Sequence, residues 1–264
     1  MSTPFDDFVS IIQRLRKECP WDRAQTHASI RSALIEEAYE VVESIDLNDM
    51  DALKQELGDV ILNAVFHAVM AEEAGSFTID DVLVSESEKL VRRHPHVFGE
   101  TDVDDVEDVL RNWEQIKLTE EGRTSVLDGI PPTLPALQFA ERVQGKAARV
   151  GFDFETPDEA WAKVREELGE LEQVRKADDE ALESELGDLL FAVVNYARLR
   201  GVSPEMALRA TNKKFQRRFR YIETQLNAGG RSADEATLEE MDALWDEAKE
   251  REREGEGGKE KGKG

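Results

Sequence analysis

The hydrophobic positions of the chain recur mostly at intervals of three and four residues. This spacing is typical of helices that bury one face, whereas the alternation expected of half-buried strands is scarce. The pattern predicts helices near residues 5–17, 28–46, 50–74, 78–93, 104–120, 134–148, 157–176, 180–200, 204–227 and 237–252. We therefore expect an all-α protein.

Proline, glycine and short polar segments separate these helices. Pro20 follows Cys19 in a predicted turn, Pro131 and Pro132 end a segment, and Ser203-Pro204 resembles a helix cap with its first residue. The predicted divisions are an N-terminal helical domain at 1–120, a linker at 121–133, a C-terminal helical domain at 134–253 and a tail at 254–264. The tail is rich in Gly, Lys and Glu, so we expect it to be disordered.

The two halves of the chain repeat the same three elements in the same order. An EExxE block, an ELGD block and a basic pair spaced i,i+4 occur in each half. The first copy has Glu36-Glu37-Ala38-Tyr39-Glu40, Glu56-Leu57-Gly58-Asp59, and Lys89 with Arg93. The second copy has Glu166-Glu167-Leu168-Gly169-Glu170, Glu185-Leu186-Gly187-Asp188, and Lys214 with Arg218. This duplication indicates two tandem copies of one helical hairpin.

The acids of the first copy are placed symmetrically about the turn between two helices. Glu40 and Glu56 each lie eight residues from Asn48, and Glu37 and Asp59 each lie eleven residues from it. Residues three apart share a helix face, so an antiparallel hairpin brings both pairs to matching heights.

The second copy repeats this arrangement about a midpoint near Ala177. Glu170 pairs with Glu185, and Glu167 pairs with Asp188. Four facing carboxylates repel one another unless a cation lies among them, and hard divalent cations such as Mg²⁺ prefer oxygen ligands. A single glutamate of this kind is more often part of a solvated face, but the duplicated set of eight favours a metal site.

Composition narrows the classes of ligand and compartment. The net charge of −24 over 264 residues argues against DNA or RNA as partners, although divalent cations can still bridge acids to a polyphosphate. The single cysteine, Cys19, fits a reducing compartment and is more often a packing residue than a nucleophile. We find neither a signal peptide nor an apolar run long enough to cross a membrane, so we expect a cytoplasmic protein.

Several long segments resemble the MazG family of all-α nucleoside triphosphate pyrophosphohydrolases, in its two-domain form. Besides the acidic blocks, these are CPWDRAQTHAS at 19–29, KLVRRHPHVFG at 89–99, KAARVGFDF at 146–154 and ATNKKFQRRFRYIE at 210–223. The resemblance implies a four-helix-bundle fold formed with homodimerisation. It also implies Mg²⁺-dependent hydrolysis of nucleoside triphosphates between the α- and β-phosphates, to a nucleoside monophosphate and pyrophosphate.

The resemblance also assigns roles to individual positions. The implied metal ligands are Glu167, Glu170, Glu185 and Asp188 in the C-terminal copy and Glu37, Glu40, Glu56 and Asp59 in the N-terminal copy. It implies that Lys214 and Arg218 hold the phosphate chain, that Trp245 contributes to activity, and that catalysis falls mainly to the C-terminal copy.

Other roles follow from position and chemistry rather than from the resemblance. Glu166 or Glu167 is a candidate to orient or deprotonate the attacking water. Asn195 and Asn212 lie on helices beside the acids, where substrate contact and structural hydrogen bonding are equally compatible with the pattern.

Two other classes of protein share parts of this pattern. A ferritin-like di-metal protein needs Glu-x-x-His on two helices, whereas both second blocks here read ELGD. A non-enzymatic dimeric regulator that only binds a nucleotide or a metal remains an alternative. Measuring monophosphate and pyrophosphate release from triphosphates with Mg²⁺ distinguishes it from an enzyme.

Overall fold

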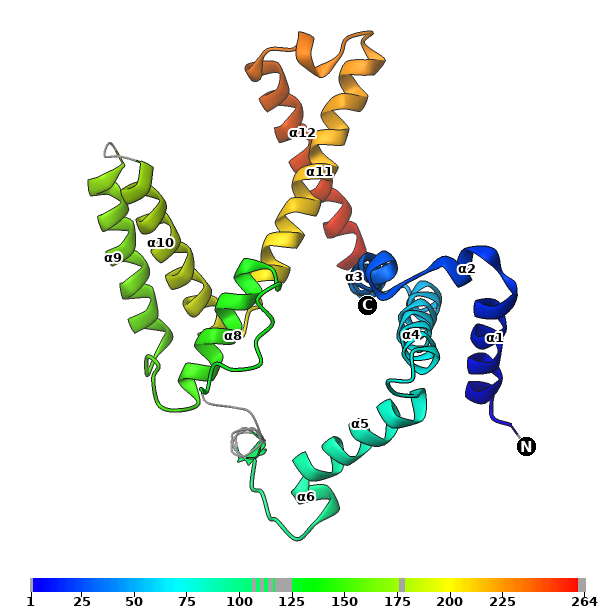
Figure 1. Ribbon diagram of the computed structural model, residues 1–264. Helices are drawn as coiled ribbons and strands as arrows, with labels where there is room; N and C mark the ends of the chain where they lie inside the picture. The colour runs from blue at the N-terminus through cyan, green and yellow to red at the C-terminus, as the bar shows by residue number, and fades with distance from the viewer. Residues whose placement is uncertain are drawn as a thin grey trace. The chain divides into compact units, whose positions relative to one another are not determined.

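The computed structural model describes residues 2–105, 108–109, 112–113, 116, 125–175 and 179–260. Regular structure in this part of the chain is helical, and no strand occurs in it, which confirms the predicted all-α class. The chain divides into two compact units, Met1–Lys117 and Leu118–Gly264, whose helices are shown in Figure 1.

The N-terminal unit is organised around one long helical hairpin. Its helices are α1 (Pro4–Glu18), α2 (Pro20–Ala24), α3 (His27–Leu47), α4 (Met50–Glu73), α5 (Ile79–Arg93) and α6 (Pro95–Phe98). Asn48 ends α3 in the left-handed conformation with φ of 53°. The side chain of Asp49 then accepts hydrogen bonds from the first turn of α4. These two adjacent residues reverse the chain, so that α3 packs against α4.

The core of the N-terminal unit lies between α1 and the second half of α4. Its buried residues are Ile12, Val65, Phe66, Val69 and Met70. They occupy one face of each helix, as the three-to-four spacing of apolar positions requires. The opposite end of α4, which carries the ELGD block, extends beyond this core beside α3. The acids of that block therefore lie on a helix whose other end is anchored by packing.

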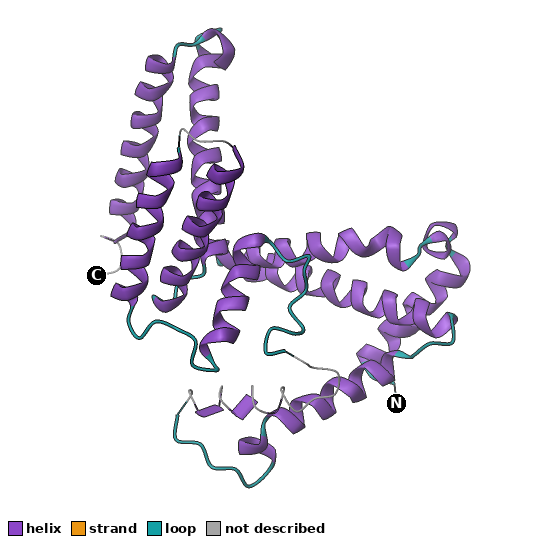
Figure 2. Ribbon diagram, turned by 60° about the vertical axis from the view of Figure 1, so that its left-hand side comes forward, coloured by secondary structure: helices purple, strands orange, loops and turns teal. Residues whose placement is uncertain are grey.

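The C-terminal unit contains two helical hairpins joined through α8 (Figures 1 and 2). Its elements are α8 (Ala136–Ala148), α9 (Pro157–Val174), α10 (Asp179–Leu199), α11 (Pro204–Ala228), the 3₁₀ turn η1 (Ala233–Glu235) and α12 (Leu238–Glu260). Helix α9 packs against α10, α11 packs against α12, and α8 contacts both α10 and α11. Two acidic blocks thus face each other on α9 and α10, as on α3 and α4.

The structure differs from the predicted helix pattern at a few positions. Residues 20–24 form the short helix α2 instead of a turn, because Pro20 occupies the first helical position, where its missing N–H costs nothing. Helix α12 continues to Glu260, past the expected end near 252 and into the segment for which disorder was predicted. Glu247 and Arg251 form an i,i+4 ion pair that favours helix up to residue 251.

Some expectations fall wholly or partly outside the described residues. Most of the helix predicted at 104–120 and the first part of the linker predicted at 121–133 belong to this group. Within the described part of the chain, no helix has both the length and the apolar character needed to span a membrane.

Candidate functional site

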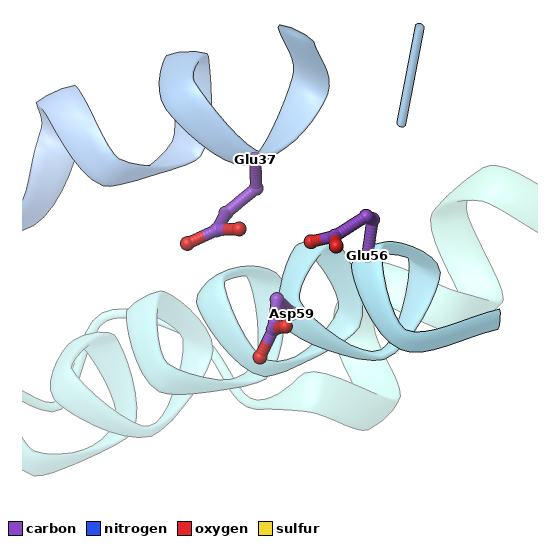
Figure 3. A group of neighbouring side chains, drawn as sticks. All are labelled: Glu37, Glu56 and Asp59. Carbon is purple, nitrogen blue, oxygen red and sulfur yellow. The ribbon is translucent and has the colours of Figure 1, made fainter. Parts of the chain in front are cut away.

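The first acidic cluster lies between α3 and α4. Glu37 extends from α3 toward Glu56 and Asp59 on α4, as Figure 3 shows. One carboxyl oxygen from each of the three residues can be chosen so that all lie within 4.8 Å of one another. The hairpin turn at Asn48 sets this register, because it places residues at equal distances from the turn opposite each other. The donors are oxygens only, a set that suits a hard divalent cation.

Two glutamates of this cluster, Glu37 and Glu56, have pKa values above the usual value for a glutamate. Desolvation is the largest cause that raises the pKa of Glu37, followed by the negative charges of Asp59 and Glu40. The pKa of Glu56 is likewise raised by desolvation first and then by Glu40. Glu40 therefore acts on both neighbours although it lies outside the group of three. Mutual repulsion of this kind is what a bound cation relieves.

The second acidic cluster lies between α9 and α10. Glu167 and Glu170 of α9 and Glu185 of α10 place one oxygen each within 4.8 Å of the others. Glu167 is 5% exposed, an unusual position for a carboxylate. The pKa of Glu170 is raised, chiefly by the charge of Glu167, then by desolvation and by Glu185. Both clusters therefore consist of carboxylates contributed by the two helices of a hairpin. In both clusters, neighbouring negative charges raise the pKa of at least one glutamate.

Lys163 is a member of the second site that the sequence analysis missed. Its Nζ atom lies 2.8 Å from Oε1 of Glu166 and 2.5 Å from Oε1 of Glu167. Hydrogen bonds to these two carboxylates, Glu166 first, raise the pKa of the lysine. The ammonium group thus supplies part of the positive charge that the cluster needs. The i,i+3 and i,i+4 spacing from Lys163 to the two acids was the available signal.

A cavity of about 660 Å³ opens beside the second cluster. Glu167, Asp188 and Lys163 line one part of it, and Asn195 lines another. Asp188 thus borders the same space as Glu167, although it does not belong to the compact group of three. A cavity of this volume lies within the range of small-molecule sites. The arrangement places carboxylates in the wall of a cavity whose lining is otherwise largely apolar.

The predicted phosphate-binding and aromatic residues lie on the other hairpin of the unit. Arg218 of α11 donates to Oε2 of Glu252 from Nε at 3.0 Å and from Nη2 at 2.8 Å. Its guanidinium group also lies 5.3 Å from the ring centroid of Trp245 of α12. None of Asn212, Lys214, Arg218 and Trp245 lines the cavity that borders Glu167. In the structure these residues lie on α11 and α12, whereas the acids of the second cluster lie on α9 and α10.

Fold and site together define an all-helical protein with two hairpins, each of which points several carboxylates at one another. Comparison with known proteins identifies the family. The model of the MazG nucleotide pyrophosphohydrolase domain matches twice, at residues 25–98 and 155–222, and each match spans an EExxE and an ELGD block. The chain belongs to the MazG family, which confirms the resemblance.

Relatives cover nearly the whole chain. A Thermotoga maritima protein named "Nucleoside triphosphate pyrophosphohydrolase/pyrophosphatase MazG" is 45% identical over 93% of this chain and 95% of its own length. An Escherichia coli K12 protein named "Nucleoside triphosphate pyrophosphohydrolase" is 44% identical over 94% of this chain and 97% of its own. A crystal structure of a mazG-related protein from Thermotoga maritima matches 42% of this chain and 97% of its own, with 28% identity and a TM-score of 0.39.

Proposed function

We propose that this chain is a Mg²⁺-dependent enzyme that hydrolyses nucleoside triphosphates between the α- and β-phosphates. The products are a nucleoside monophosphate and pyrophosphate, and the role is control of the nucleotide pool. Membership of the MazG family and the names of the relatives support this activity. The observation that carries the proposal is the convergence of Glu167, Glu170 and Glu185 within 4.8 Å beside a cavity.

The carboxylates fit magnesium because they present only oxygen donors and repel one another without a cation. Glu167, Glu170, Glu185 and Asp188 would hold the ion in the C-terminal copy. Glu37, Glu40, Glu56 and Asp59 would do so in the N-terminal copy. When bound, Mg²⁺ supplies charge that neutralises the triphosphate and makes a nearby water more acidic.

The remaining residues act on the water and on the two ends of the substrate. Glu166 is exposed and pairs with Lys163. Once substrate phosphates attract that ammonium group, the Glu166 carboxylate would be free to accept a proton from water. Lys214 and Arg218 would stabilise the departing pyrophosphate.

Three further residues would contact the nucleoside. Trp245 offers a stacking surface, and Asn195 and Asn212 offer amide groups. Of these, Asn195 already lines the cavity beside the acids.

Homodimerisation would complete the fold and the site. Both acidic hairpins expose large apolar side chains, among them Leu57 and Ile61 on α4 and Leu190 and Phe191 on α10. A second copy would cover these faces, as four-helix bundles require. It would also allow Lys214 and Arg218 to meet acids of the other chain. We expect nucleoside triphosphates as substrates, neither DNA, RNA nor a membrane as a partner, and the cytoplasm as the compartment.

Product analysis of acid variants tests the proposal. The full chain is incubated with each triphosphate and Mg²⁺, and monophosphate and pyrophosphate are measured. Glu185→Ala and Asp188→Ala should lower the rate by at least about a hundredfold while helicity is unchanged. Glu183→Ala removes an exposed acid from the same helix and serves as the matched control.

Three outcomes of this experiment are informative. Loss of activity in Glu185→Ala and Asp188→Ala with a normal rate in Glu183→Ala supports the assignment. Normal rates in all three variants contradict it. Saturable triphosphate binding by the wild-type chain without turnover would favour the non-enzymatic regulator instead.

A further inference from the structure

Glu252 of α12 forms ion pairs with two neighbouring arginines of α11. Its Oε2 atom accepts hydrogen bonds from Arg218, at 3.0 Å from Nε and 2.8 Å from Nη2. Its Oε1 atom accepts a hydrogen bond from Nε of Arg217 at 2.7 Å. Hydrogen bonds from Arg217 and then from Arg218 lower the pKa of Glu252, so this carboxylate is ionised at neutral pH. Two cations and one carboxylate leave a net positive charge, which still attracts an anion.

The hydrogen bonds to Glu252 leave another edge of the Arg218 guanidinium available. A guanidinium group carries five N–H donors, and different pairs of them can face an oxyanion. Glu252 occupies the edge formed by Nε and Nη2, and Nη1 has no hydrogen-bond partner among the described residues. None of the buried, unpartnered polar atoms found in this part of the chain belongs to Arg218, so Nη1 retains accessible surface. Arg218 can therefore donate to a phosphate while it stays paired with Glu252.

Trp245 of α12 contacts the face of the same guanidinium group. The Cζ atom of Arg218 lies 5.3 Å from the centroid of the Trp245 ring. Trp245 in turn packs against Phe215 of α11, with ring centroids 5.2 Å apart. Glu252 thus holds one edge of the guanidinium group, and Trp245 holds one face. An arginine that is already held in one conformation loses less side-chain entropy when a ligand binds.

Stability of the hairpin does not by itself explain this ion pair. Helices α11 and α12 contribute buried apolar residues, namely Ile222, Leu226 and Ala248. The side chains of Arg218 and Glu252 are only 16% and 20% exposed, so both charges have lost much of their hydration. Such pairs often add little net stability, because the loss of hydration offsets the attraction, although they can select one arrangement of side chains. The contact therefore fits a residue that orients Arg218.

We propose that Glu252 is a positioning residue, which holds the Nε and Nη2 edge of Arg218 so that Nη1 donates to the phosphates that leave as pyrophosphate. The inference rests on the proposed function, in which Arg218 stabilises the departing pyrophosphate. Arg217 supports the arrangement by holding the other oxygen of Glu252. A carboxylate that merely competed with phosphate for Arg218 would slow the reaction, and its removal would speed the reaction. The sign of the effect therefore separates positioning from inhibition.

A double-mutant cycle in the full chain tests whether Glu252 acts through Arg218. Glu252→Gln keeps the size of the side chain and removes its charge. With triphosphate and Mg²⁺, this variant should have a kcat about ten- to a hundredfold lower and a KM changed less than about threefold, because the contact forms with the departing group. In a chain that carries Arg218→Met, adding Glu252→Gln should change kcat less than about twofold.

Glu250→Gln is the matched control, because Glu250 is an exposed acid on the same helix. Its kcat and KM should equal those of the wild-type chain. An unchanged or higher kcat in Glu252→Gln would overturn the inference. An equal loss of kcat with and without Arg218→Met would also overturn it, because Glu252 would then act on the hairpin and not through Arg218.

A second measurement needs no turnover. The Nε–H signal of Arg218 in a ¹H–¹⁵N spectrum is assigned by its absence in Arg218→Met. Its proton should exchange with water at least about tenfold faster in Glu252→Gln than in the wild-type chain, because the carboxylate that accepts this hydrogen bond is gone. Adding pyrophosphate with Mg²⁺ to the wild-type chain should shift the signal and leave the exchange slow.

Fast exchange after pyrophosphate is added would contradict the inference, because the anion would then have displaced Glu252. The absence of any shift would also contradict it, because Arg218 would not contact the phosphates. The proposed function is judged separately by the turnover of triphosphates in the wild-type chain. Turnover that is normal in both the wild-type chain and Glu252→Gln would refute the inference and leave the proposed function intact.

Discussion

Lys163 would compete with a cation bound at the second acidic cluster, and replacing this lysine would make the competition measurable. Its ammonium group lies 2.5 Å from Oε1 of Glu167, so a cation held by this carboxylate must displace the ammonium or bind beside it. Lys163→Met removes one positive charge and keeps most of the side-chain volume. The variant should therefore bind Mg²⁺ more tightly than the wild-type chain in the absence of nucleotide.

The size of the effect follows from Coulomb's law. At about 4 Å in a medium as polar as water, the repulsion between a unit charge and a divalent cation corresponds to roughly a thirtyfold change in a binding constant. The lysine side chain is 38% exposed and can swing toward solvent, where screening weakens the repulsion. We therefore expect Mg²⁺ to bind the variant about three- to tenfold more tightly.

Calorimetric titration of the nucleotide-free chain with Mg²⁺ at constant ionic strength measures this affinity. Lys249→Met is the matched control, because Lys249 is 37% exposed and pairs with Asp246, which is itself 69% exposed. The control variant should bind Mg²⁺ as the wild-type chain does. Unchanged or weaker binding by Lys163→Met would refute the reasoning that the ammonium and the metal share one site.

Two predictions concern protons at the acidic clusters. The pKa of Glu56 is raised above its usual value of 4.5, so the folded chain without metal binds this proton more tightly than the unfolded chain does. At neutral pH the ionised Glu56 therefore lowers the stability of the folded chain. This loss of stability disappears as the pH falls through the raised pKa, because the carboxylate becomes protonated. Glu56→Gln should thus stabilise the metal-free chain at neutral pH and lose this stabilising effect in acid. Urea unfolding at several pH values measures both effects. A variant that is less stable than the wild-type chain at neutral pH would contradict the prediction. Because the pKa of Glu170 is also raised, Mg²⁺ affinity should fall as the pH drops through it, and titration calorimetry that finds a constant affinity there would contradict the account.

Helices and acid pairing could be predicted from the sequence because they depend on local spacing. Counting outward from Asn48 identified Glu37 and Asp59 as partners, and both belong to one cluster in the structure. Counting residues from the turn predicts which residues face each other, because a short turn allows the two antiparallel helices few alternative registers. The MazG resemblance rested on the same blocks and is confirmed by the family match.

Other parts of the site depend on packing that spacing does not encode. Gln144 is one of several polar residues on α8, and only the structure shows that it is buried and lines the cavity beside the second cluster. Lys163 had a readable spacing, but an i,i+4 pair with an acid is common on helix surfaces. Lys214 and Trp245 lie on the α11–α12 hairpin and do not line the cavity beside Glu167, a relation that sequence order does not reveal.

The central claim is that Glu167, Glu170 and Glu185 hold a divalent cation against the phosphates of a nucleotide. A crystal structure of the full chain with Mn²⁺ and an α,β-imido triphosphate would test it most directly, because the anomalous signal locates the metal independently of the protein model. The account predicts an anomalous peak among these three carboxylates, with phosphate oxygens on the same ion. Metal and phosphates bound elsewhere, with the three carboxylates turned to solvent, would contradict it.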